Sequence, residues 1–404
     1  MRVTIFPSKA TGVVSAPPSK SIAHRALICG ALTERCTIHN CGQSQDIQAT
    51  FRCLEALGAS VEMQGDTVII GGLDPYKLPE HPLLDCGESG STLRFLLPLC
   101  LLSCQEVTLI GRGRLMERPL GVYESLCRER GFTFEQVGNT LKVRGQLDSG
   151  VYTVDGNVSS QFITGLLLAL TQVHGKSRVE VVNQLESASY VDITTDVLSA
   201  FGCPIERADN AFIVSEDVKL AADEYTVEGD CSNAAFLDAY NLLNGDVKVM
   251  NLSPETPQGD WVYKQMYRDL SLGKREFDLS DCPDLGPVMF ALSAVCGGAR
   301  FTGTARLRIK ESDRCAAMAE ELAKFGVKTE IGDNSVTIFP AKLSKPSEVL
   351  YGHNDHRIVM ALSLLCSVTG GSIEGAQAVA KSYPDYFRVI RSLGIELITD
   401  CMKV

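Results

Sequence analysis

The sequence lacks any uninterrupted apolar run of about twenty residues, the length one helix needs to cross a membrane. Its first residues, MRVTIFPSKATG, contain neither a long apolar core nor a small-residue cleavage site, so we expect no secretory signal peptide. Positive charge is also in deficit: the formal net charge of −11 argues against a nucleic acid or a membrane surface as the main partner. These absences predict a cytoplasmic protein.

Closely spaced cysteine pairs are missing as well. The chain has 15 cysteines but no Cys-x-x-Cys pair, and the cysteines lie among apolar residues, as at Cys29, Cys100 and Cys366. Zinc sites need close pairs with matching partners, and disulfide frameworks belong to short secreted chains. We therefore expect reduced cysteines that serve as small core residues, with no metal site and no cofactor.

The chain has enough apolar sequence for a large interior. It contains 404 residues, of which 45% are hydrophobic, and at ordinary domain sizes this length predicts two domains. No Pro/Ser-rich linker or low-complexity run marks a boundary between them. The position of the boundary must therefore be inferred from a repeat in the sequence.

One repeat is visible in five segments that each read as the end of an amphipathic helix, a glycine at its C-cap and an alternating strand. Their glycines are Gly58, Gly131, Gly202, Gly326 and Gly394. The spacings are 73, 71, 124 and 68 residues. The long gap indicates a missing copy, and MYRDLSLG, ending at Gly273, supplies it.

A second series consists of six apolar helices that each begin with a polar cluster. The polar starts predict helix N-caps, and the apolar bodies predict buried helices. Their markers are Lys20, Gly90, Ser160, Ser232, Asp284 and Asp355, spaced by 70, 70, 72, 52 and 71 residues.

Each series has one short interval, which is 53 residues from Gly273 to Gly326 in the first and 52 residues from Ser232 to Asp284 in the second. The only stretch common to these two intervals is 273–284. A shared period and a shared defect argue against chance similarity of ordinary helix–strand units. The sequence thus predicts an α/β fold of six repeated units, with a strand pair lost near 273–284. Six units suggest two lobes of three, and we expect lobe I to comprise 1–18 plus 228–404 and lobe II to comprise 19–227.

The starts of the buried helices predict an anion-binding cleft. A first helical turn offers unpaired N–H groups, and the helix dipole adds about half a positive charge. Polar and cationic side chains gather at four of these starts, namely Lys20, Ser21, His24, Arg25, Ser91, Thr92, Arg94, Ser159, Ser160, Gln161, His356 and Arg357. Further cations lie in 111–120, 306–314 and 380–387. An unpaired charge at the end of a buried element would be costly, so the set favours a substrate with several negative charges.

Two carboxylates lie among these cations. Asp284 begins a buried helix, where an N-cap fits the position as well as a proton acceptor does. Glu311 lies between Lys310 and Arg314, which should keep it ionised in the free site. Both residues are therefore candidates for proton transfer.

Ten segments across the whole chain, taken in order, resemble the EPSP synthase family (3-phosphoshikimate 1-carboxyvinyltransferases). They are PPSKSIAHRALICGAL (17–32), GESGSTLRFLLPL (87–99), LMERPL (115–120), NVSSQFITGLLLAL (157–170), SYVDIT (189–194), VEGDCSNAAF (227–236), CPDLGPVMFAL (282–292), RIKESDR (308–314), NDHRIVMALSL (354–364) and AKSYPDYF (380–387). The resemblance implies the two-lobed enolpyruvyl transferase fold, an inside-out α/β barrel of six βαβαββ units. This fold agrees with the repeat found without it.

The resemblance also implies two substrates, phosphoenolpyruvate and shikimate 3-phosphate, in an interdomain cleft. It assigns shikimate 3-phosphate to Lys20, Ser21, Arg25, Ser159, Ser160, Gln161, Ser187, Asp284 and Lys310. It assigns phosphoenolpyruvate to Lys20, the backbone at Gly90, Arg118, Gln161, Arg314, Arg357 and Lys381. We expect a monomer with no nucleic-acid or membrane partner.

In the family, the 5-hydroxyl of the shikimate attacks C2 of phosphoenolpyruvate while C3 is protonated, and phosphate then leaves as C3 loses a proton. Asp284 matches the proton acceptor for the hydroxyl, and Glu311 matches the proton donor and acceptor at C3. Lys20 would assist proton transfer and charge balance, and His356 would orient Glu311. Fixed positive groups in a closed site that has expelled water would stabilise the developing charges.

Two positions depart from the family pattern. Glu88 and Arg306 stand where the family often has asparagine, so neither inherits a binding role.

Three other functions compete with the one that the resemblance implies. A UDP-N-acetylglucosamine enolpyruvyl transferase would carry a cysteine that the loop GRGRLMERPL (111–120) lacks. An inactive paralogue would have lost Lys20, Asp284 or Glu311, and an RNA-end cyclase would have a basic surface.

Overall fold

The computed structural model describes residues 1–216 and 218–400, which divide into two units. Unit 1 joins Met1–Pro17 to the chain from Gly229 onward, and unit 2 is the continuous segment Pro18–Glu228. The boundaries predicted from the sequence, after residues 18 and 227, lie one residue from each position in the structure. Each unit buries its own hydrophobic core.

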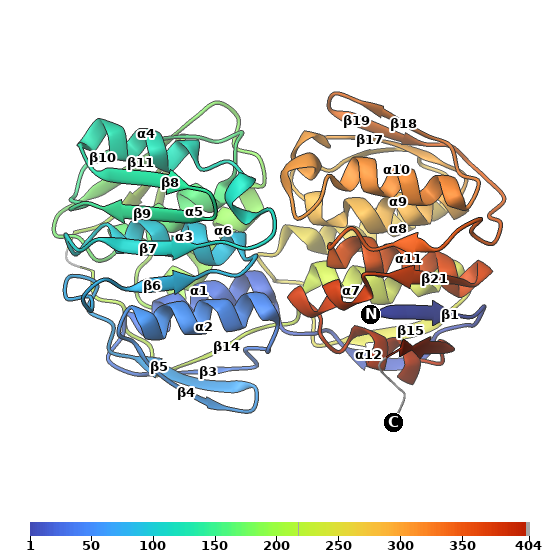
Figure 1. The fold of residues 1–404 in the computed structure, drawn as a ribbon, viewed down its shortest axis with the longest axis horizontal. Coiled ribbons are helices and arrows are strands. Elements are labelled where there is room, and N and C mark those ends of the chain that lie inside the picture. The colour runs from blue at the N-terminus through green and yellow to red at the C-terminus, as the bar shows by residue number, and fades with distance from the viewer. Residues whose placement is uncertain (217, 401–404) are drawn as a thin grey trace. The chain divides into compact units, whose positions relative to one another are not determined.

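Unit 2 is built around three helices that are buried on almost every side: α1 (Lys20–Ala31), α3 (Gly90–Cys100) and α5 (Ser160–Leu170). Three partly exposed helices accompany them: α2 (Gln45–Ala56), α4 (Gly121–Arg130) and α6 (Ala188–Ala200) (Figure 1). A helix that is apolar all round is stable only inside a core. The first three predicted buried helices are therefore confirmed.

Three four-stranded sheets enclose these helices, in the orders β14-β3-β5-β4, β6-β7-β9-β8 and β10-β11-β13-β12. In each sheet the first pair is parallel and the other two pairs are antiparallel. The strands are β3 (Cys36–His39), β4 (Ser60–Gln64), β5 (Thr67–Gly71), β6 (Leu83–Asp85), β7 (Val107–Ile110), β8 (Thr133–Val137), β9 (Thr140–Arg144), β10 (Val151–Asp155), β11 (Ser177–Val182), β12 (Glu206–Ala208), β13 (Ala211–Val214) and β14 (Glu224–Thr226). One topology repeated three times confirms the predicted repeat in this unit.

Unit 1 repeats the plan with buried helices α7 (Cys231–Asp238), α9 (Gly286–Val295) and α11 (His356–Thr369). Its other helices are α8 (Tyr263–Ser271), α10 (Arg314–Lys324) and α12 (Tyr386–Ser392). Its strands are β1 (Arg2–Ile5), β2 (Thr11–Ser15), β15 (Asp246–Met250), β16 (Glu276–Asp278), β17 (Ala299–Thr302), β18 (Thr329–Gly332), β19 (Ser335–Ile338), β20 (Leu350–Tyr351), β21 (Gly371–Glu374) and β22 (Leu397–Thr399).

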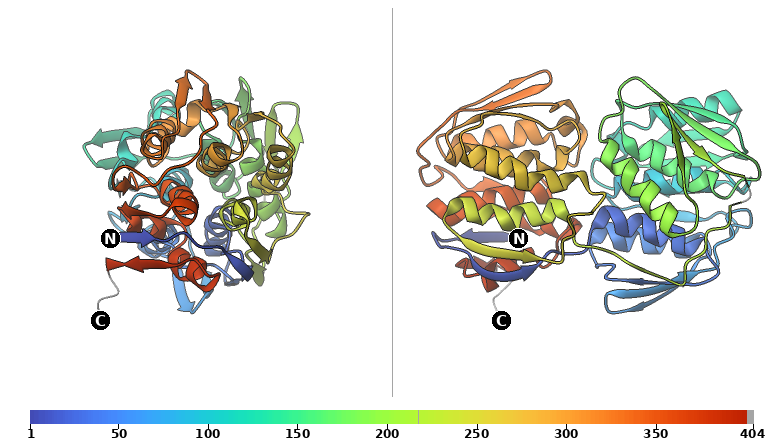
Figure 2. Two further views of the ribbon diagram at one scale, coloured as in Figure 1. Left: turned by 90° about the vertical axis from the view of Figure 1, so that its right-hand side faces the viewer. Right: turned by 180° about the vertical axis from the view of Figure 1, so that it is seen from behind.

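Two sheets of unit 1, β16-β17-β19-β18 and β20-β21-β1-β22, have the same topology as those of unit 2. In the second, the N-terminal strand lies among C-terminal strands, seen in Figure 2 as blue beside red. Among the residues that the structure describes, the third sheet has only the parallel pair β15-β2. Only residues 272–275 separate α8 from β16, which is too short for an antiparallel pair. The predicted loss of a strand pair is confirmed.

Most cysteines lie in the two cores. Of the 14 cysteines in the described part of the chain, 12 are buried, and none of the 14 is joined in a disulfide. Burial raises the pKa of the Cys366 thiol above its ordinary value, as it does for several others. Across residues 1–216 and 218–400, no helix is both long and apolar enough to cross a membrane.

Candidate functional site

The predicted polar helix starts are N-caps at most of the buried helices. The Ser89 side chain accepts a hydrogen bond from Thr92 N at the start of α3, and the Ser159 side chain accepts one from Gln161 N at the start of α5. Asp230 caps α7 and Asp355 caps α11 in the same way. Each cap orients the first turn of a buried helix, where N–H groups are available to an anion.

Lys20, the first residue of α1, reaches across to α2. Its Nζ lies 2.8 Å from Oδ2 of Asp46, and both side chains are largely buried, with 16% and 12% of their surface exposed. Asp46 was not predicted from the sequence, because an acidic residue in the first turn of a helix is an ordinary feature. The contact holds the lysine ammonium against the first turn of α2.

A chain of hydrogen bonds behind Lys20 joins the first three helices. His24 Nδ1 lies 2.8 Å from Thr50 Oγ1, Thr50 Oγ1 lies 2.7 Å from Thr92 Oγ1, and Thr92 donates to Ser89 at 2.7 Å. Burial lowers the pKa of His24 well below its ordinary value, and the charges of Lys20 and Arg25 lower it further. His24 is therefore neutral at physiological pH.

Arg25 is anchored to helices of its own unit. Its Nε donates to Thr194 Oγ1, its Nη2 donates to Tyr190 O and Thr164 Oγ1, and its Nη1 donates to Ser21 O. These bonds use four of the five N–H groups of a guanidinium. One Nη1 hydrogen remains for a ligand, so any role of Arg25 toward a substrate is combined with holding α1 against α5 and α6.

Arg118 and Gly90 meet in unit 2. A Cβ atom added at Gly90 would lie 2.7 Å from Arg118 Nη1, so the guanidinium rests against the first residue of α3. Beside them, Gln161 Oε1 accepts from Arg94 Nη1 at 2.7 Å, and Gln161 Nε2 donates to Ser91 Oγ at 3.0 Å. A side chain at position 90 would displace the cation, which explains the glycine there.

In unit 1, Arg314 binds three carboxylates at once. Its fully buried side chain lies 2.8 Å from Asp284 Oδ1, 2.8 Å from Glu311 Oε2 and 2.8 Å from Asp355 Oδ2. Arg357 Nη2 lies 2.9 Å from the other oxygen of Asp284, and Lys310 Nζ lies 3.5 Å from Oδ1. Lys381 donates to the carbonyl oxygen of Asn354 at 2.6 Å. These contacts bring together the cations and carboxylates predicted for this half of the chain.

Asp284 does not cap the helix that follows it, so that interpretation was wrong. It lies inside the 3-10 turn Pro283–Leu285, and the N-cap position of α9 is Leu285. Burial alone would raise the pKa of Asp284, but Arg357, Lys310 and Arg314 outweigh burial and hold it well below its ordinary value. Asp284 is thus ionised and shared among three cations.

Burial has the opposite consequence for Lys310. It lowers the pKa of Lys310 to about 8, helped by Arg306 and Arg314 and opposed by Asp284. The pKa of Arg314 is instead raised, because its carboxylate partners outweigh burial. In this arrangement an incoming anion must compete with Asp284 for the cations.

All predicted site residues lie within the described part of the chain. Unit 2 holds Lys20, Ser21, Arg25, Gly90, Arg118, Ser159, Ser160, Gln161 and Ser187, and unit 1 holds Asp284, Lys310, Glu311, Arg314, Arg357 and Lys381. Ser187 is buried and takes a left-handed backbone conformation ahead of α6. Asp46 and Asp355, which pair with predicted cations, are the additions that the structure makes to the set.

The chain matches the sequence model of EPSP synthase (3-phosphoshikimate 1-carboxyvinyltransferase) over residues 6–390. A 3-phosphoshikimate 1-carboxyvinyltransferase of Clostridium kluyveri is 38% identical over 418 residues, covering 98% of each chain. Another from Clostridium novyi is 37% identical over 425 residues, covering 97% of each.

Solved structures share the fold. An EPSP synthase from Acinetobacter baumannii matches with a TM-score of 0.80 at 21% identity, covering 99% of this chain and 100% of that one. An enolpyruvyl transferase from Streptomyces tendae matches with a TM-score of 0.76 at 15% identity, covering 98% of each chain. With the family match over residues 6–390, the relatives show that this chain belongs to the EPSP synthase family, transferases of the shikimate pathway in aromatic amino-acid biosynthesis.

Proposed function

We propose that this chain transfers the enolpyruvyl group of phosphoenolpyruvate to the 5-hydroxyl of shikimate 3-phosphate, giving 5-enolpyruvylshikimate 3-phosphate and phosphate. The observation that carries the proposal is the cluster in unit 1 where Arg314 and Arg357 share Asp284. An anionic substrate and a proton acceptor would use the same cations there. A cytoplasmic, monomeric protein is part of the same proposal.

Both units contribute residues in this proposal. Unit 2 would supply most of the contacts to shikimate 3-phosphate, from the starts of α1 and α5 and from Ser187. Phosphoenolpyruvate would be bound by Lys20, Gly90, Arg118 and Gln161 of unit 2 together with Arg314, Arg357 and Lys381 of unit 1. Asp284 and Lys310 would be the contribution of unit 1 to the shikimate.

Phosphoenolpyruvate would also activate the base. While Asp284 is held by Arg314, Arg357 and Lys310, its low pKa makes it a weak proton acceptor. The carboxylate and phosphate of phosphoenolpyruvate would take over hydrogen bonds from these arginines. With its cations partly withdrawn, Asp284 would gain proton affinity when the 5-hydroxyl is beside it. The base would then be strong only in the presence of its substrate.

The reaction would proceed by addition and elimination. Glu311 first takes up a proton from solvent. The 5-hydroxyl oxygen then bonds to C2 as its proton passes to Asp284, and Glu311 gives its own proton to C3. Glu311 then takes a proton back from C3, the double bond re-forms, and the C2–O bond to phosphate breaks. The proton held by Asp284 leaves with the phosphate, which restores the base. Lys20, held at the start of α1 by Asp46, would balance the developing charge.

The direct test is phosphate release from purified protein. Mixed with phosphoenolpyruvate and shikimate 3-phosphate, the protein is expected to release phosphate in proportion to enzyme and time, and to release none when shikimate 3-phosphate is omitted. UDP-N-acetylglucosamine serves as the competing acceptor. Release with UDP-N-acetylglucosamine but not with shikimate 3-phosphate would overturn the proposal.

Lys310 predicts how KM for shikimate 3-phosphate depends on pH in the alkaline range. Its pKa of about 8 means that the ammonium is charged below pH 8 and loses its charge as the pH rises through that value. A charged ligand of shikimate 3-phosphate would then be lost, so KM for this substrate is expected to rise by up to about tenfold per pH unit above this pKa. Steady-state kinetics between about pH 6 and about pH 10 measures the rise.

The matched variant for this prediction is Lys310→Arg. A guanidinium stays protonated throughout the range, so the alkaline rise in KM should disappear even if the absolute KM changes. An unchanged alkaline rise in the variant would assign the titration to another group.

A further inference from the structure

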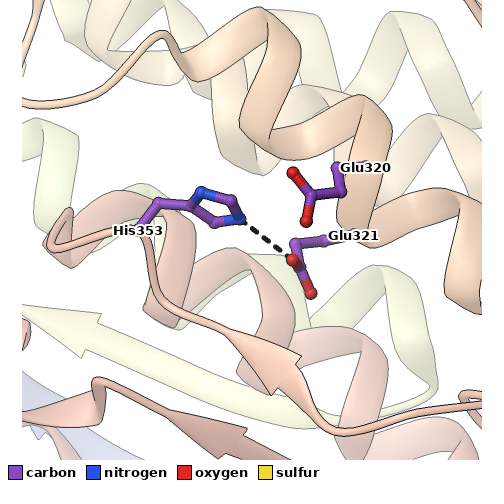
Figure 3. A group of neighbouring side chains, drawn as sticks. All are labelled: Glu320, Glu321 and His353. Atoms are coloured by element: carbon purple, nitrogen blue, oxygen red, sulfur yellow. Dashed lines mark hydrogen bonds and ion pairs between the residues drawn. The ribbon is translucent and has the colours of Figure 1, made fainter.

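A buried carboxylate outside the cluster just described is Glu321, on α10. Its side chain is completely buried, and it lies beside His353 and Glu320 in Figure 3. Its oxygens accept from Lys324 Nζ at 2.9 and 3.0 Å and from Tyr351 N at 3.0 Å, and His353 Nε2 lies 2.9 Å away. Burial would raise the pKa of Glu321, but the bonds from His353, Lys324 and Tyr351 outweigh it and lower the pKa. An ionised carboxylate only accepts, so His353 Nε2 is the donor.

Glu321 links two segments that carry predicted phosphoenolpyruvate ligands. It lies seven residues after Arg314 on the same helix, which is about two turns, so the two side chains share a face. The segment 350–357 supplies Asp355, which binds Arg314, as well as the Asn354 carbonyl, which binds Lys381, and Arg357 itself. Through Tyr351 and His353, Glu321 therefore holds this segment against α10.

The segment 350–357 needs such a restraint. Strand β20 comprises only Leu350 and Tyr351, which pair with β21 along two residues. The next non-glycine residues, His353 and Asn354, have φ angles of +48° and +51°. A left-handed backbone conformation is less favourable than a right-handed one for an L-residue, so two in succession persist where surrounding contacts support them. The bonds to Glu321 are contacts of that kind.

We propose that Glu321 is a positioning residue of the transferase: it fixes the segment 350–357 against α10 and thereby sets the geometry of Arg314, Arg357 and Lys381 toward phosphoenolpyruvate. The inference rests on the proposed function. It assigns Glu321 no contact with substrate. Its effect would fall on phosphoenolpyruvate, because the predicted ligands of shikimate 3-phosphate lie mainly in unit 2.

The same side chains could be taken for a metal site. One ligand atom each from Glu320, Glu321 and His353 lies within 4.8 Å of the others. However, the ammonium of Lys324 already binds both oxygens of Glu321. A divalent cation would have to displace it and leave two positive charges close together. The contacts of Lys324 therefore favour a structural role for Glu321, as an ion-paired carboxylate that holds the segment 350–357, over a metal site.

The test is the variant Glu321→Gln, with KM measured for each substrate. Glutamine keeps the shape but presents one acceptor oxygen and an NH₂ group to donors that faced two charged oxygens. The segment would then occupy its binding geometry for a smaller fraction of the time. We expect KM for phosphoenolpyruvate to rise about tenfold or more, with KM for shikimate 3-phosphate within about twofold of the wild type.

Two further variants distinguish positioning by Glu321 from a general effect of lost charge or lost stability. Glu320→Gln removes the same charge from an exposed neighbour on the same helix and should leave both KM values within about twofold. His353→Asn tolerates the left-handed backbone but is too short to reach Glu321. It keeps the Glu321–Lys324 pair intact, so it should fold and still raise KM for phosphoenolpyruvate, by about threefold.

Each other outcome contradicts a specific statement. An inactive wild type would remove the proposed function itself. An active wild type, with Glu321→Gln unchanged or with both KM values raised equally, would remove only the positioning role. A calorimetric titration with zinc alone tests for a metal site. If zinc binds tightly to the wild type but not to Glu320→Gln, and if activity requires the metal, then these side chains form a metal site and the positioning role of Glu321 is wrong.

Discussion

Replacing Glu311 with glutamine is expected to lower kcat by a factor of about a hundred or more while shikimate 3-phosphate still binds. Glutamine has the shape of glutamate but cannot give a proton to C3 of phosphoenolpyruvate or take one back. Arg314 keeps its contacts with Asp284 and Asp355, so the cluster should stay assembled. Steady-state kinetics gives the loss in kcat, and calorimetry with shikimate 3-phosphate alone gives the retained affinity.

The control for this experiment is Asp313→Asn, two residues away. Asp313 caps α10 by accepting a hydrogen bond from Ala316 N, and asparagine caps helices equally well. The variant removes one negative charge near the cluster without removing a proton donor, so kcat should change by about twofold at most. Near-wild-type turnover in Glu311→Gln would take Glu311 out of the mechanism.

The local part of this site was readable from the sequence. Helix N-caps leave a signature of polar residues before an apolar run, and Ser89, Ser159 and Asp355 are caps in the structure. The lost strand pair was readable for a similar reason, because a repeat with constant spacing shows a deletion as one short interval. In both cases the information lies within a few residues or in a count of residues.

The pairings between distant segments were not readable. Lys20 pairs with Asp46, 26 residues away, and Glu321 binds His353, 32 residues away. Nothing in one sequence marks which of 49 acidic residues faces a given cation. Asp284 is an example of a residue whose surroundings could not be inferred from the sequence. Its position ahead of a buried helix suggested a cap, whereas its low pKa and three cationic neighbours are consequences of tertiary packing.

Arg314 holds the cluster together, and its replacement by methionine should have the largest effect on stability. The buried cation would be removed from three carboxylates, of which Asp355 is completely buried. Leaving buried charges without a partner costs about 3–5 kcal/mol in the free energy of unfolding. The same change at Arg300, an exposed residue of β17, should cost less than about 0.5 kcal/mol. Urea unfolding of both variants at neutral pH measures the difference.

The pH dependence tests whether the lost charge is the cause. In the wild type the pKa of Asp284 is lowered, so its stabilising contribution is present above its ordinary pKa of 3.8 and is lost as the pH falls through the lowered value. Without Arg314 the remaining carboxylates would protonate more easily, so the stability gap between wild type and Arg314→Met should narrow below about pH 4. Adding Asp355→Asn to Arg314→Met should restore part of the lost stability, because Asp355 is completely buried and the charge that Arg314 compensated disappears with it. A gap that is constant with pH and a double variant no more stable than Arg314→Met would mean that Arg314 stabilises unit 1 through packing instead of through charge.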